Sequence, residues 1–165
     1  MAPTDTLIVR AALDGKTYRD IEIEASKSLY KLAEAIISAF AFDFDHAFGF
    51  YGGDPFAARR AQPRYELFAD MGEADPGVLG VRKTKVAEAF PTIGGSLLFL
   101  FDYGDEWRFR VKLKAKGAKL AKTRYPRVVA SRGEAPEQYP EPEEMPNDRP
   151  GYGYNPLTGQ KMKIG

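Results

Sequence analysis

The strongest periodic signal in the chain is a stripe of apolar residues between positions 29 and 40. Its members recur every three or four residues, as on one face of an α-helix: Leu29, Leu32, Ala33, Ile36, Ile37 and Phe40. The pattern predicts a helix over residues 27–40, with Ser26 as its N-cap and the stripe packed on a sheet. We therefore interpret the stripe as part of the core and not as a binding surface.

Two strands are expected before this helix. Apolar side chains alternate with other side chains over residues 6–12 and again over 19–24, where the outer face is acidic. Asp14 and Gly15 lie between the two segments, and this pair favours the positive φ angles of a tight hairpin turn. The sequence thus predicts an antiparallel hairpin.

The segment after the helix is less regular. Residues 46–51 are typical of a strand, and a long, weakly patterned excursion follows over 52–80, with a short strand expected at 65–68. Thr84 is a suitable cap for a short helix that ends at Phe90, because a proline comes next.

A second hairpin is predicted over residues 96–116. The segment 96–101 is apolar on both faces, which favours a central strand covered on both sides. Turn-forming residues occupy 102–105, and apolar residues then alternate with basic residues over 107–116.

Hairpins combined with a few helices indicate an α+β fold. The first half has the rhythm of a ubiquitin-like ββαβ roll, which the second, C-terminal β-hairpin and the short helix would extend. The length fits one domain, placed at residues 5–132. Residues 133–165 hold six of the twelve prolines, so a Pro/Gly-rich extended C-terminal tail is expected.

Composition excludes several classes of site. The chain has no cysteine and one histidine, His46, so thiolate metal sites, cysteine nucleophiles and two-histidine metal motifs are ruled out. We assign no catalytic residue, no metal ligand and no cofactor from the sequence. No apolar run has membrane-spanning length and no secretory pattern opens the chain, so a cytoplasmic protein without membrane contact is expected.

The near-neutral total charge hides a basic block. Residues 92–132 carry ten basic and three acidic residues, a net charge of +7, and no acidic residue occurs after position 106 in this block. A local cationic excess of this kind is a candidate contact for nucleic acid. The alternative is edge protection, in which outward cations prevent strand-to-strand aggregation. The candidate residues are Arg108, Arg110, Lys112, Lys114, Lys116, Arg124 and Arg127.

Carboxylates cluster at the turn of the second hairpin. Asp102, Asp105 and Glu106 could join Asp43, Asp45 and His46 in a metal or acid–base site. The alternative is that the aspartates bind turn amides while Gly104 adopts a positive φ. Trp107 is interpreted as a core anchor, with stacking on a base or ligand as the alternative.

Two stretches resemble the plasmid pRiA4b ORF-3-like family. One is the helix with the segment that follows it, which leads through Phe42-Asp43 to His46 and Phe50. The other is Phe101-Asp102-Tyr103-Gly104-Asp105-Glu106-Trp107, close to the central motif of the family. Tyr125-Pro126 resembles a further family pair, whereas Phe109 and Gln138 depart from the family pattern. The family motif residues are Asp102, Gly104, Asp105, Trp107, His46, Tyr125 and Pro126.

The resemblance implies an α+β fold, occurrence on plasmids and beside transposases, and no established catalytic activity. We therefore expect a non-enzymatic binding module whose partner is nucleic acid or another protein, with no small-molecule cofactor. The alternative is a metal-dependent hydrolase that uses Asp102, Asp105 and His46.

Overall fold

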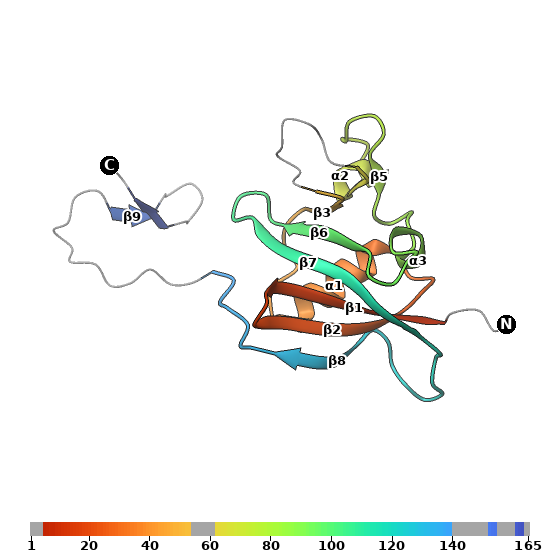
Figure 1. The fold of residues 1–165 in the computed structure, drawn as a ribbon. Coiled ribbons are helices and arrows are strands. Elements are labelled where there is room, and N and C mark those ends of the chain that lie inside the picture. Colours follow the sequence, from red (N-terminus) through yellow and green to blue (C-terminus); the bar gives the residue numbers. More distant parts are fainter. Residues whose placement is uncertain (1–4, 54–61, 140–151, 155–160, 164–165) are drawn as a thin grey trace.

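The computed structural model describes residues 5–53, 62–139, 152–154 and 161–163 (Figure 1). The strands are β1 Thr6–Asp14, β2 Thr17–Glu24, β3 Phe48–Tyr51, β4 Arg64–Glu66, β5 Leu79–Gly80, β6 Ser96–Phe101, β7 Trp107–Gly117, β8 Arg127–Arg132, β9 Tyr152–Tyr154 and β10 Lys161–Lys163. The helices are α1 Leu29–Ala39, α2 Leu67–Asp70 and α3 Val86–Ala89.

Eight of the strands form one sheet, in the order β5-β4-β3-β6-β7-β1-β2-β8. Every neighbouring pair is antiparallel except β4 and β5, and the fold is therefore a mixed α+β fold as predicted. The second hairpin, β6-β7, is not an extension of the sheet edge. It fills the centre between β3 and β1, because β7 pairs with β1.

The N-terminal hairpin is confirmed, but its turn is closed differently from the prediction. Neither Asp14 nor Gly15 has a positive φ. Instead, a carboxylate oxygen of Asp14 accepts a hydrogen bond from the Lys16 backbone N–H at 2.8 Å. A register shift between Ala12 and Asp14 accommodates this turn.

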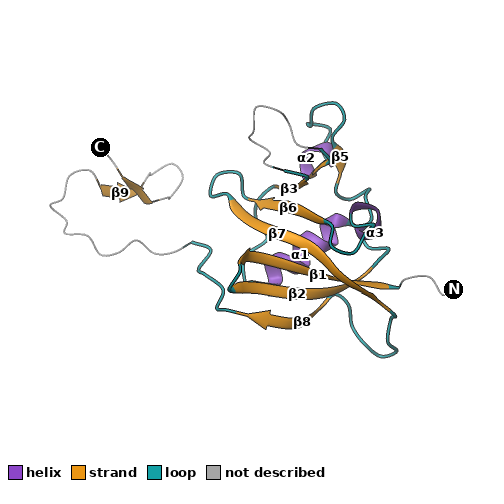
Figure 2. Cartoon of the chain, viewed as in Figure 1, coloured by secondary structure: helices purple, strands orange, loops and turns teal. Residues whose placement is uncertain are grey.

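Helix α1 buries the predicted apolar stripe against the sheet (Figure 2). The N-cap is Ser28 and not Ser26, because the Ser28 hydroxyl accepts a hydrogen bond from the Lys31 N–H at 3.2 Å. At the other end, the guanidinium of Arg19 donates to the Ala39 carbonyl at 3.3 Å and lies over the Phe40 ring. Arg19 therefore links the end of the helix to β2.

The excursion between β3 and β6 contains more structure than the sequence predicts. The strand expected at 65–68 is β4, and α2 and β5 follow it. Thr84 does not cap α3, whose N-cap is Lys85. The Thr84 hydroxyl donates instead to the Gly80 carbonyl at 2.8 Å and ties the start of α3 to β5.

The two faces of the sheet differ in what covers them. Helices α1 and α3 pack on one face over a core rich in phenylalanine, and the opposite face is called the outer face below. β6 is central, as predicted: Phe99 and Phe101 are buried in the core, and Leu100 is buried on the outer face.

The segment after β8 runs without helix to residue 139. β9 and β10 form a separate two-stranded antiparallel sheet. The rest of the expected tail, residues 140–151, 155–160 and 164–165, lies outside the described residues. The division into a domain at 5–132 and a tail at 133–165 stays a prediction. In the described part, no helix combines the length and the apolar character that a membrane span requires.

Candidate functional site

Three segments that are distant in the sequence meet at one end of the sheet. The loop between α1 and β3 supplies Asp45 and His46, the turn between β6 and β7 supplies Asp102 and Asp105, and the segment after β8 supplies Tyr139. The structure therefore brings His46 together with three of the four aspartates that the sequence singles out, Asp45, Asp102 and Asp105, whereas Glu106 pairs with Arg108.

The β6-β7 turn is organised by Asp102. One carboxylate oxygen of this buried side chain accepts hydrogen bonds from the backbone N–H groups of Gly104 at 3.0 Å and Asp105 at 3.2 Å. The left-handed backbone predicted for Gly104 is wrong. Asp102 (φ 66°) and Glu106 (φ 55°) carry the positive φ angles, and the Glu106 N–H donates to the Asp102 carbonyl at 2.6 Å. Aspartate tolerates this conformation because its short side chain bonds locally.

His46 is held on one ring nitrogen by several oxygen atoms. Its Nε2 atom lies 2.5 Å from the Tyr139 hydroxyl, 3.3 Å from a carboxylate oxygen of Asp102 and 3.5 Å from one of Asp45. The Tyr139 hydroxyl also contacts both carboxylate oxygens of Asp45, at 3.1 and 3.0 Å. Nε2 thus has acceptors on several sides, which fixes the orientation of the imidazole.

Gln138 and Tyr139 are site residues that the sequence analysis missed. The buried Gln138 amide accepts a hydrogen bond from the Asp43 N–H at 2.6 Å and donates to the Asp43 carbonyl at 3.0 Å. The Gln138 amide thus makes the two hydrogen bonds that a neighbouring strand would make to Asp43, and it holds this part of the chain beside Asp45. The resemblance to the family marked Gln138 only as a departure from the family pattern, and no local pattern pointed to Tyr139, because a tyrosine in a proline-rich segment is typical of a surface.

Two acidic groups of this cluster have raised pKa values. Burial, reinforced by Asp102, raises the pKa of Asp105, and His46 partly opposes the rise. Burial and the carboxylate of Asp45 raise the pKa of the Tyr139 hydroxyl. Across residues 5–53 and 62–139, no three His, Asp or Glu side chains are arranged to hold a metal ion.

The basic strand β7 is the second candidate region. Arg110 and Lys112 pair with Ala12 and Arg10 on the outer face, are exposed and form no ion pair with any described residue. Arg108 is paired with Glu106 at 2.8 Å. The predicted one-sided stripe ends at Lys114, because a bulge opposite Ile8 and Val9 shifts the register there.

Beyond the bulge, Lys116 faces the other side of the sheet. It pairs with the buried Leu7, and its ammonium donates to the Pro91 carbonyl at 3.3 Å. Arg124 is exposed in the connection to β8. Arg127 lies on the outer face and binds Glu22 with two hydrogen bonds, at 3.0 and 2.8 Å.

A further polar cluster is buried on the outer face beside β3. The Tyr51 hydroxyl donates to Glu66 at 2.6 Å and contacts the Tyr103 hydroxyl at 2.6 Å, and Arg64 donates to Glu66 at 3.1 Å. A Cβ on Gly49 would lie 2.6 Å from the Tyr51 hydroxyl, so only glycine leaves room for this ring. Burial raises the pKa of Tyr103 to about 12. No sequence pattern pointed to this cluster.

Comparison with known proteins identifies the family to which the motif around residues 101–107 belongs. The family model "Plasmid pRiA4b ORF-3-like protein" matches residues 9–142. The chain belongs to this family. The crystal structure of the protein of unknown function MM3350 from Methanosarcina mazei Go1 is similar in fold, with a TM-score of 0.61 and 20% sequence identity over 82% of this chain and 74% of that one. No curated protein matches the chain.

The pRiA4b ORF-3-like motif residues do not form a single site. His46, Asp102 and Asp105 meet as described, and the centre of the Trp107 ring lies 4.8 Å from that of Phe42. Its indole N–H is buried and has no hydrogen-bond partner among the described residues. Tyr125 and Pro126 lie elsewhere, before β8, where the Tyr125 hydroxyl accepts a hydrogen bond from the Leu120 N–H at 3.0 Å.

Replacing Asp105 with asparagine in this pRiA4b ORF-3-like protein is expected to stabilise it at neutral pH by about 0.5 kcal/mol, the scale of an exposed charge pair. The raised pKa means that this group favours the folded state below its unfolded pKa and loses that contribution as pH rises through its folded pKa. Asparagine keeps a donor toward Asp102 without the charge repulsion. Urea titrations should show the gain at pH 7 and none at pH 3, and an equal gain at both values would contradict the electrostatic cause.

Proposed function

We propose that this protein is a non-enzymatic binding module that binds nucleic acid weakly and without sequence preference through the outer face of β7. The supporting observation is that Arg110 and Lys112 are exposed side by side on this face, with no ion pair in the described part of the chain. Residues i and i+2 of a strand lie on the same face about 6.8 Å apart, and this spacing is compatible with that of successive phosphates.

The surrounding charges support the same proposal. Asp20 is already bound by Arg10, at 2.8 Å, and Glu22 by Arg127. The acidic residues of this face are thus neutralised by other cations, and Arg110 and Lys112 remain available to an anionic ligand. Arg10 is itself held by Asp20 and by the Tyr18 ring, 3.8 Å from its centre, so it does not compete for the same ligand.

We also propose that the N-terminal half of the chain is a ubiquitin-like roll. In a ubiquitin-like ββαβ roll with the β6-β7 hairpin inserted between β3 and β1, α1 covers one face of the sheet, and the outer face of β7 is exposed at Arg110 and Lys112. Association with plasmids or transposable elements, where a nucleic-acid contact is useful, is an extension from the family description.

Reversing the two charges in Arg110→Glu/Lys112→Glu is expected to abolish binding to a short duplex or single strand. With two or three phosphate contacts, the logarithm of the wild-type affinity should fall with log salt at a slope of about −2 to −3. Fluorescence anisotropy at low ionic strength measures both quantities. The melting temperature should barely change, because these side chains face solvent.

The matched control reverses two exposed lysines away from β7, in Lys27→Glu/Lys83→Glu. Both double variants change the net charge equally, so a loss of binding common to both would reflect total charge and not the outer face of β7. Unaltered binding by Arg110→Glu/Lys112→Glu would make the strand a case of edge protection and overturn the proposal.

A hydrolase is the second candidate function, favoured by the convergence of His46, Asp102 and Asp105 and by the raised pKa of Asp105. Such a site would use an aspartate and the imidazole as acid–base pair, with or without a divalent metal. Metal-dependent cleavage of DNA or RNA by pure protein, lost in Asp105→Asn with the fold intact, would support it. Absence of cleavage with Mg²⁺, Mn²⁺ and Zn²⁺ would remove it.

A further inference from the structure

The edge strand β8 presents one side of its backbone to which no described strand is added. β8 pairs with β2 on one side, and no described strand lies on its other side. It also exposes two apolar side chains, Val128 at 46% and Val129 at 41%. Exposed, unpaired edges with apolar residues are the sites at which extended peptides add as an extra strand.

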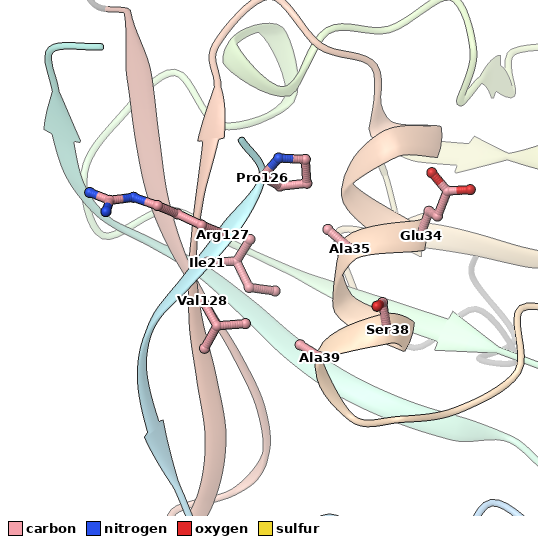
Figure 3. A pocket seen from close by; sticks show the side chains of 8 residues that line it. All are labelled: Ile21, Glu34, Ala35, Ser38, Ala39, Pro126, Arg127 and Val128. Atoms are coloured by element: carbon pink, nitrogen blue, oxygen red, sulfur yellow. The ribbon is translucent and has the colours of Figure 1, made fainter. Parts of the chain in front are cut away.

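A groove between β8 and α1 adjoins this edge (Figure 3). Pro126, Val128 and Ile21 line it from the sheet, and Ala35 and Ala39 line it from the helix, whereas Arg127 extends away from the helix. The groove continues the layer between α1 and the sheet past β2. A strand added to β8 would place every second side chain in this apolar layer.

The charges around the edge identify the occupant. Arg124 and Arg132 are exposed near the two ends of β8 and form no ion pair with a described residue. Two carboxylates beside the edge are already engaged, since Glu22 binds Arg127 and Glu34 on the groove rim pairs with Lys31. Glu134 follows Arg132 by two residues, so the two arginines still outnumber the carboxylates near the ends of β8 that have no described partner. An incoming strand would therefore meet uncompensated positive charge.

A second copy of the chain fits this edge poorly. Antiparallel pairing of two β8 strands over their full length would place Arg127 opposite Arg132 at both ends. Like charges directly opposite each other destabilise a strand pair. The same charges favour an acidic strand, because there each cation would gain a partner.

We propose that β8 and the groove beside α1 form a docking site for an extended acidic peptide segment of a partner protein, which adds as a ninth strand to the sheet. Main-chain hydrogen bonds to β8 provide the pairing, apolar side chains of the segment occupy the groove, and its carboxylates contact Arg124 and Arg132. This interaction is independent of the outer face of β7.

The probe is a fluorescent peptide that alternates glutamate with valine. We expect it to bind and to slow amide hydrogen exchange within residues 127–132. Val128→Lys should weaken binding by about tenfold, the value of one buried valine side chain. Ile93→Lys is the matched control. Ile93 precedes β6 and is 57% exposed, so a lysine there adds the same charge away from the edge.

Each alternative gives a distinct result. If attraction between charges alone causes binding, Val128→Lys and Ile93→Lys will strengthen it equally, and a peptide alternating glutamate with proline will bind as well, although it lacks every second N–H. Either result overturns the proposal. So does the absence of binding, protection of 127–132 by an oligonucleotide instead of the peptide, or a dimer of the free protein paired through β8. Arg110→Glu/Lys112→Glu should leave peptide binding intact, so this test and that of the proposed function fail separately.

Discussion

Replacing Glu66 with alanine is expected to lower the free energy of unfolding by about 3–5 kcal/mol, because it leaves a buried charge without its partner. Glu66 accepts hydrogen bonds from both Tyr51 and Arg64. The Arg64 side chain is 7% exposed, and its Nε and Nη1 atoms have no partner among the described residues. Removing Glu66 takes away the ion pair that Arg64 forms with a described residue.

The double variant Arg64→Met/Glu66→Leu separates this cause from a simple cavity. It removes both charges and fills the space with apolar atoms, so it should be clearly more stable than Glu66→Ala, although it carries more substitutions. Chemical denaturation followed by circular dichroism measures both variants. A double variant as unstable as the single one would show that packing, and not the stranded guanidinium, dominates.

Replacing Asp102 with alanine is the second large perturbation, with an expected loss of about 2–4 kcal/mol from two turn hydrogen bonds and an unfavourable left-handed backbone. The carboxylate of Asp102 bonds the N–H groups of Gly104 and Asp105 and approaches His46. Alanine replaces none of these contacts and tolerates a φ of 66° poorly.

Asparagine at the same position is the matched control. It retains an oxygen for the turn amides and adopts the left-handed conformation readily, so Asp102→Asn should lose less than about 1.5 kcal/mol. Thermal and urea unfolding compare the two variants. Equal destabilisation by alanine and asparagine would mean that the negative charge beside His46, and not the turn, is the stabilising feature.

The regular elements could be predicted from the sequence because their signals are local. Six apolar residues at helical spacing define α1, and all six are buried in the structure. The alternation in β1, β2 and β7 and the doubly apolar β6 likewise indicate which residues face the core. Predictions of single caps and turns were weaker. A nearby residue serves as the helix N-cap in place of Ser26 and Thr84, and nearby residues adopt the positive φ predicted for Gly104. The reason is that several adjacent residues can satisfy the same backbone groups.

The candidate sites depended on contacts between distant segments, which no local pattern encodes. Tyr139 meets His46 across 93 positions, and Arg127 neutralises Glu22 across 105. A single bulge in β7 turns Lys116 to the other side of the sheet and shortens the basic stripe. The sequence by itself thus determined the α+β fold, the helix, the two hairpins and the motif residues. The tertiary structure alone decided which charges remain free, because pairing order, register and burial are properties of the whole sheet.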